Sequence, residues 1–134
     1  MDCDLQHDES KLIDMLDLFS KSSSLDLVIG SRFTADGEIS DKAFSKTREI
    51  GSKIITVIIK KILSINSTDP LSGFFMVRKE SFLKCSDNLQ TQGFKILADF
   101  LSISGKTIKI EEVGYKFKNR ILGESKMSFV SVLE

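Results

Sequence analysis

Residues 25–33 read LDLVIGSRF, an apolar run that ends in glycine, serine, arginine and phenylalanine. The run from Leu25 to Ile29 is short and rich in branched apolar side chains, which predicts a buried strand. A polar segment precedes it at 21–24, and before that segment apolar residues recur at the spacing of one helix face. A helix followed by a buried strand is typical of α/β proteins.

Elements of alternating type continue along the rest of the chain. The first helix begins near Asp8, with acids in the turn where the helix dipole favours them. The pattern also predicts a loop over 34–41, a helix over 42–64, a turn over 66–72, a strand over 73–78, a helix over 94–101 that Gly105 breaks, and strand residues over 108–117. This order predicts one α/β domain over residues 1–134. Because these strands alone would leave sheet edges open, we expect a further part of the sheet upstream of them.

The overall charge bears on whether the partner is a nucleic acid. Lysine and arginine (19) balance aspartate and glutamate (19), so the net charge does not indicate a nucleic-acid partner. The charge is nevertheless uneven, since residues 1–29 hold seven acids and two lysines, and residues 116–126 hold four bases and one acid. Such polarity suits a site where a cation and anionic groups meet, and it is equally typical of a solvated surface.

Cysteines and apolar stretches bear on the compartment. Cys3 and Cys85 are too few for a disulfide framework, so we expect both to be reduced, as in a cytoplasmic protein. No apolar stretch approaches the roughly 20 residues that span a bilayer. The stretch from Ile50 to Leu63 has an apolar stripe with lysines beside it, which either rests on a membrane surface or packs against the sheet. We therefore expect a chain that is soluble or peripheral to a membrane.

The first residues contain a candidate metal site. Asp2 and Asp4 are two residues apart, so on an extended segment their carboxylates point to the same side, and Gln6 adds a third oxygen there. Mg²⁺ and Mn²⁺ prefer such oxygen ligands. A solvated acidic segment is the alternative interpretation. His7 is a possible further ligand, although its place before a helix favours a capping or surface role.

Five segments together resemble one enzyme family. They are D-C-D-L-Q-H at 2–7, G-S-R-F at 30–33, D-P-L-S-G-F-F at 69–75, G-F-K-I-L at 93–97 and N-R-I-L-G-E-S-K at 119–126. In this order and at these intervals they resemble the dolichol- and polyprenol-phosphate mannosyltransferases, and their glucosyl relatives, of glycosyltransferase family 2. The resemblance implies a GT-A fold, with a Rossmann-like mixed sheet. It also implies that this chain is the C-terminal metal and acceptor part, without the N-terminal half that binds the nucleotide.

The resemblance also implies roles for individual residues. Asp2, Asp4 and Gln6 match the metal-binding D-x-D-x-Q segment, and Arg32 matches an arginine that faces phosphate. Arg48 lies where a further phosphate-binding arginine is expected. The remaining assignments lie on the acceptor side of the site: Asp69 and Ser72 shape it, and Arg120, Ser125 and Lys126 contact the acceptor phosphate. Asp4, Arg32 and Arg120 are the implied catalytic residues.

Each of these residues also has an ordinary structural interpretation. Arg32 follows a strand and is open to interpretation as a surface charge. Asp69 precedes a proline and is a natural first residue of a turn that Ser72 closes. Arg120 is compatible with the charged outer side of an edge strand, and residues 125–126 are compatible with a plain loop.

The predicted reaction is transfer of a hexose, with mannose favoured, from a nucleotide sugar to a polyprenyl or dolichyl phosphate at the cytoplasmic face of a membrane. GDP-mannose or a UDP-hexose would be the donor, Mg²⁺ or Mn²⁺ the cofactor, and the resemblance implies inversion of the sugar. A phosphate monoester has its second pKa near about 6, so the acceptor is substantially ionised and needs no general base. The alternatives are a non-lipid glycan acceptor, or an inactive fragment that only binds anions or a partner.

Overall fold

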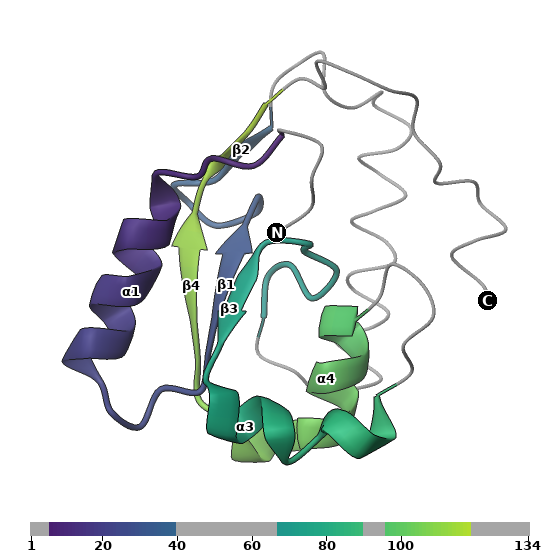
Figure 1. Cartoon of the computed structure of the whole chain (residues 1–134). Helices are drawn as coiled ribbons and strands as arrows, with labels where there is room; N and C mark the ends of the chain where they lie inside the picture. Colours follow the sequence, from purple (N-terminus) through teal and green to yellow (C-terminus); the bar gives the residue numbers. More distant parts are fainter. Residues whose placement is uncertain (1–5, 40–66, 90–95, 119–134) are drawn as a thin grey trace, which may run out of the picture.

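A computed structural model describes residues 6–39, 67–89 and 96–118 of the chain (Figure 1). The helices are α1 (Lys11–Lys21), α3 (Lys79–Leu83) and α4 (Ile96–Ser104), with short 3-10 turns at Ser86–Asn88 and Gly105–Thr107. The strands are β1 (Leu27–Ser31), β2 (Glu38–Ile39), β3 (Phe75–Val77), β4 (Ile110–Gly114) and β5 (Lys116–Phe117). The described part is therefore α/β, as the sequence predicts.

The main sheet is small and mixed. Its strand order is β3-β1-β4, and β1 runs antiparallel to β3 and parallel to β4. In the register, Ile29 of β1 lies between Phe75 of β3 and Glu112 of β4. A second, two-stranded parallel sheet joins β2 to β5.

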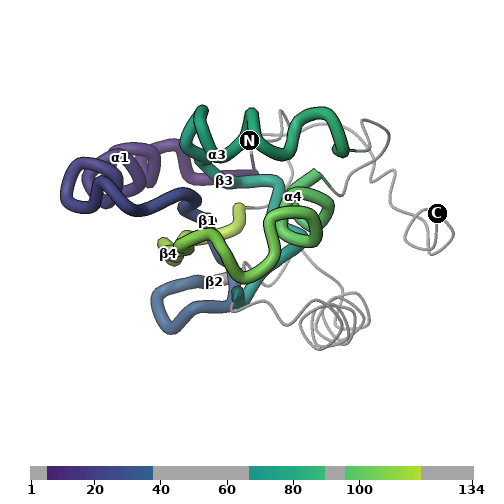
Figure 2. Tube along the Cα trace, turned by 90° about the horizontal axis from the view of Figure 1, so that it is seen from below, coloured from purple at the N-terminus to yellow at the C-terminus, as the bar shows by residue number. Residues whose placement is uncertain are grey.

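Helices cover the sheet on both faces, with α1 on one side and α4 on the other (Figures 1 and 2). All five residues of β1 are buried, which is typical of a strand covered on both faces. Leu27 and Ile29 pack with the α4 residues Leu97 and Phe100. On the opposite face the core is formed by Met15 of α1 with Leu25, Val28, Phe74, Tyr115 and Phe117.

The predicted elements agree with the described ones in type more than in boundary. Helices near residues 8–20 and 94–101 and a strand within 73–78 are confirmed by α1, α4 and β3. The strand predicted over 25–29 begins two residues later and continues through Ser31. The prediction that 34–41 is only a loop is wrong, because β2 lies within it, and α3 was not predicted. The helix predicted over 42–64 lies outside the described residues.

One edge of the sheet gathers residues from three separate parts of the chain. The carboxyl ends of the parallel strands β1 and β4 lie at this edge, and the antiparallel β3 begins there. The residues after β1, the last residues of β4 and the turn at 67–74 consequently meet. In open α/β sheets, ligands bind outside the carboxyl ends of the strands. No helix within the described ranges is both long and apolar enough to cross a membrane.

Candidate functional site at the carboxyl edge of the sheet

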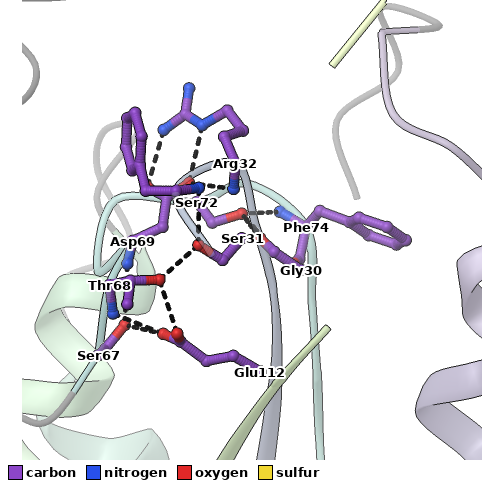
Figure 3. Close-up of polar contacts among 10 residues, drawn as sticks. Gly30, Ser31, Arg32, Ser67, Thr68, Asp69, Ser72, Phe74 and Glu112 are labelled. Atoms are coloured by element: carbon purple, nitrogen blue, oxygen red, sulfur yellow. Dashed lines mark hydrogen bonds and ion pairs between the residues drawn. The ribbon is translucent and has the colours of Figure 1, made fainter. Parts of the chain in front are cut away.

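Arg32 and Asp69 form the centre of this edge (Figure 3). Arg32 Nε and Nη2 donate to the two carboxylate oxygens of Asp69, at 2.7 and 2.8 Å. The backbone N–H of Arg32 donates to the same carboxylate at 3.3 Å. The Asp69 side chain is 0% exposed and that of Arg32 is 11% exposed. The structure thus joins two residues that the sequence assigned separately, one to phosphate and one to the acceptor side.

Two aromatic rings further restrain the guanidinium. The Arg32 Cζ atom lies 5.3 Å from the centre of the Phe33 ring and 5.4 Å from the centre of the Phe117 ring. A cation within about 6 Å of an aromatic face is attracted to it. The Nε and Nη2 side of Arg32 is therefore occupied by a carboxylate and the guanidinium lies against two rings, which together fix its direction. The interpretation of Arg32 as a plain surface charge is not supported by this packing.

Ser72 fixes the turn to the strand beside it. Its hydroxyl donates to the Gly30 carbonyl at 2.6 Å and accepts the N–H of Phe74 at 3.1 Å. The N–H of Ser72 donates to the Asp69 carbonyl at 3.1 Å, and the residue is 3% exposed. Ser72 therefore closes the turn and shapes this edge through the backbone.

Glu112 is a residue of this edge that the sequence did not single out. Its Oε1 accepts the Ser67 hydroxyl at 2.8 Å and the Thr68 N–H at 2.6 Å, and its Oε2 accepts the Thr68 hydroxyl at 2.6 Å. Its partners lie 44 and 45 residues away in the sequence. The one available signal is that the apolar alternation of this strand shifts by one residue between Ile110 and Val113, so that one of the two glutamates between them falls on the covered face, where a carboxylate needs partners.

The loop that carries Arg32 packs tightly on the end of β4. A Cβ atom on Gly114 would lie 2.6 Å from Thr34 Oγ1 and 2.7 Å from the carbonyl carbon of Asp36. A Cβ on Gly37 would lie 2.7 Å from the carbonyl carbon of Arg32. Both positions exclude side chains, so glycine permits the close approach of backbone to backbone.

Gln6 is the only member of the predicted metal set among the described residues. Its side-chain nitrogen donates to the Lys118 carbonyl at 3.0 Å, and the Lys118 N–H donates to the Gln6 carbonyl at 2.9 Å. These bonds give Gln6, 6% exposed, a role in joining the start of the chain to the end of β5. Asp2 and Asp4 lie outside the described residues, within which no three His, Cys, Asp or Glu side chains are grouped to hold a metal. One amide oxygen is not a metal site by itself, so the cation at Asp2, Asp4 and Gln6 stays a prediction.

The prediction for His7 was wrong. The imidazole is 5% exposed and lies among aromatic rings, with ring centres 5.3 Å from Phe74, 5.5 Å from Tyr115 and 5.8 Å from Phe117. His7 is thus a core residue on the α1 side of the sheet, not a cap or surface residue. His7 lies in no helical or strand periodicity from which its burial could be predicted.

Of the remaining residues discussed from the sequence, only Cys85 lies in the described part of the structure. Cys85 is a buried free thiol. Arg48, Arg120, Ser125, Lys126 and Cys3 lie outside the described residues, so their assignments stay predictions.

Comparison with known proteins finds no matching family model but three similar curated proteins, each named dolichol-phosphate mannosyltransferase. The Pyrococcus furiosus protein is 35% identical over 136 residues, which cover 100% of this chain and 37% of the relative. The Mycosarcoma maydis protein is 35% identical over 128 residues, which cover 95% of this chain and 42% of the relative. The Saccharomyces cerevisiae protein is 30% identical over 133 residues, which cover 96% of this chain and 48% of the relative. The chain thus spans less than half the length of the curated relatives it matches.

Proposed function

From this homology to a part of the dolichol-phosphate mannosyltransferases, we propose that the protein transfers a hexose, mannose by the names of its relatives, from a nucleotide sugar to a dolichyl or other polyprenyl phosphate. The observation that carries the proposal is the joining of Arg32 to Asp69. These residues come from two of the motifs behind the resemblance, and they meet where α/β sheets bind ligands. The chain would then be part of a GT-A domain whose nucleotide-binding half lies outside residues 1–134.

Arg32 is proposed to bind the acceptor phosphate. Its partner Asp69 comes from a motif assigned to the acceptor side, and the pair fixes the direction of the guanidinium. Arg120, Ser125 and Lys126 are proposed to complete the phosphate clamp, and Arg48 to add a further contact. A clamp of this kind aligns the phosphate oxygen with the sugar carbon that it attacks. The attack would be a single displacement that inverts that carbon.

A divalent cation, Mg²⁺ or Mn²⁺, is proposed at Asp2 and Asp4. Gln6 is the weaker candidate for a third ligand, because its side-chain nitrogen donates a hydrogen bond to the Lys118 carbonyl and the residue is buried. When bound, such a cation offsets the negative charge that develops on the departing diphosphate. GDP-mannose is the proposed donor, with a UDP-hexose as the alternative. We propose that the enzyme works at the cytoplasmic face of a membrane, where its lipid acceptor lies.

The deciding experiment uses the complete protein with vesicles that contain dolichyl phosphate. Radiolabelled GDP-mannose and UDP-glucose are supplied in separate reactions with Mg²⁺, and each mixture is extracted with organic solvent. Mannose label in the organic phase, dependent on dolichyl phosphate, is expected. Label that stays on water-soluble glycans would favour the non-lipid acceptor, and no transfer from either donor would reject the proposal.

A further inference from the structure

A chain of hydrogen bonds begins at Glu112 and ends at the backbone on both sides of the candidate site (Figure 3). The Thr68 hydroxyl donates to Glu112 Oε2 at 2.6 Å, and the Ser31 and Thr68 hydroxyls lie 2.5 Å apart. Ser31 Oγ in turn accepts the N–H of Phe33 at 3.1 Å. These hydrogen bonds therefore lead from β4, through the turn at 67–69, to the end of β1.

The carboxylate of Glu112 sets the direction of the hydroxyl bonds in this chain. An ionised carboxylate accepts only, and a hydroxyl has one hydrogen to donate. Because Thr68 gives its hydrogen to Glu112, the hydrogen between the two hydroxyls belongs to Ser31. The Ser31 oxygen is then turned to accept from Phe33. With Glu112 ionised, no other arrangement of the two hydroxyl hydrogens uses all of these contacts at once.

Both residues of the central ion pair are attached to this chain. Asp69 donates its N–H to Ser67 Oγ at 3.2 Å, and that hydroxyl donates to Glu112 at 2.8 Å. Arg32 lies between Ser31 and Phe33, and these two residues are joined by the hydrogen bond from the Phe33 N–H to Ser31 Oγ. Glu112 thus holds the backbone that presents Asp69 and the backbone that presents Arg32.

We propose that Glu112 is a positioning residue of the transfer site: through Ser67, Thr68 and Ser31 it holds the Arg32 guanidinium, with Asp69 beside it, in the direction in which it binds the acceptor phosphate. This inference rests on the proposed function. Glu112 touches neither substrate in this scheme. It acts through the two segments at 31–33 and 67–69.

The test compares Glu112→Gln with Glu111→Gln in the complete protein. Glu111 is the exposed neighbour on the same strand, so it is a matched control for charge and position. In Glu112→Gln an amide nitrogen replaces one acceptor oxygen, and the ordered direction of the chain is lost. Two quantities are measured: amide hydrogen exchange of the peptides that cover 31–33 and 67–69, and the KM and kcat for dolichyl phosphate.

Glu112→Gln is expected to speed exchange in both segments and to raise the KM for dolichyl phosphate by up to roughly ten- to hundredfold, the range for losing the charged contact between Arg32 and the phosphate. The kcat should fall as well, because a phosphate held in the wrong direction is less well aligned with the sugar carbon that it attacks. Glu111→Gln should resemble the wild type in both measurements.

A second pair of variants keeps the inference testable if Glu112→Gln does not fold. Thr68→Val removes the hydroxyl with almost no change of shape and should reproduce the raised KM, whereas Thr68→Ser keeps the hydroxyl and should restore the wild-type value. Unchanged exchange in Glu112→Gln, or faster exchange with an unchanged KM, would overturn the positioning role while wild-type transfer upheld the proposed function. Absence of mannosyl transfer by the wild type would reject the proposed function, and this inference with it.

Discussion

Arg32 and Asp69 are 37 residues apart in the sequence, yet Arg32 donates three hydrogen bonds to the Asp69 carboxylate, two from its guanidinium and one from its backbone N–H. The ion pair offsets the charge of Arg32 while fixing the plane of its fork. A guanidinium held in this way contributes geometry as much as attraction. Predictions about the site therefore concern how the fork is held as well as its charge.

The first prediction is that Arg32 and Asp69 act as one unit. Asp69→Asn leaves the largely covered Arg32 without the carboxylate that it binds, and should destabilise the protein by on the order of 3 kcal/mol. Arg32→Lys keeps a charge but cannot make the two parallel hydrogen bonds to Asp69 that fix its direction, and should raise the KM for dolichyl phosphate by about tenfold or more. In both the free energy of unfolding and the KM for dolichyl phosphate, the change in the double variant should be much smaller than the sum of the changes in the two single variants. Urea unfolding and lipid-phosphate kinetics measure these effects, with Asp17→Asn on the exposed side of α1 as the control. Strict additivity would show that the pair is not a unit.

The second prediction separates two glycines that constrain the chain for different reasons. Gly114→Ala would place a Cβ 2.6 Å from Thr34 Oγ1 and so displace the loop that carries Arg32. We expect it to lower both stability and transfer. Gly105 has φ +60° and open space around it, so Gly105→Ala should cost about 1 kcal/mol of stability through backbone strain and leave transfer unchanged. Thermal unfolding and transfer assays on both variants provide the comparison. Equal effects on transfer would contradict the close packing of this loop as the cause.

How much of this arrangement could be read from the sequence depends on the range of the interactions. Local patterns predicted α1, β1 and α4, because apolar spacing along a helix or strand reports which face is buried. Motif resemblance marked Arg32 and Asp69 but not their contact. Glu112 and Thr68 were missed because their bonds join residues more than 40 positions apart, and no local pattern encodes them. The burial of His7 likewise depends on rings that come from β3 and β5 and the residues beside them.

The third prediction concerns acid stability at the opposite end of β1. Burial by itself would raise the pKa of Asp26, but hydrogen bonds from the Ser81 hydroxyl and the Lys109 N–H, with nearby cations, hold that pKa below its ordinary value. A lowered folded-state pKa means that Asp26 adds stability above its unfolded pKa of about 3.9, and that this contribution is lost as the pH falls through the folded value. Asp26→Asn should therefore destabilise the protein near neutral pH, and its difference from the wild type should shrink in acid. Urea unfolding at a series of pH values, with Asp17→Asn as the control, would reveal it. A difference that stayed constant with pH would contradict the assignment.

The fourth prediction tests the cation at Asp2 and Asp4. Asp4→Asn in the complete protein keeps the size of the side chain but removes one of two charges, so it should lower kcat by orders of magnitude at ordinary Mg²⁺ concentrations. Because the change affects metal binding, raised Mn²⁺ or Mg²⁺ should recover part of the activity, and the thermal unfolding temperature without metal should match that of the wild type. Activity in Asp4→Asn that is normal and resists chelators would show that these carboxylates do not hold a catalytic metal.

The fifth prediction concerns Arg120, the residue proposed to face the acceptor phosphate beside Arg32. Arg120→Lys keeps the positive charge but cannot make two parallel hydrogen bonds to a phosphate, so it tests geometry separately from attraction. The loss of a charged contact corresponds to about 1.5–3 kcal/mol, or roughly ten- to hundredfold in affinity. We expect the KM for dolichyl phosphate to rise by that factor while the KM for the nucleotide sugar stays the same. Lys118→Gln is the matched control, because Lys118 is exposed two residues earlier and its side chain pairs loosely with Glu9 at 3.6 Å. If Arg120→Lys impaired only the nucleotide sugar, the segment at 119–126 would belong to the donor side, and Arg32 would be left as the acceptor-phosphate ligand supported by the described part of the structure.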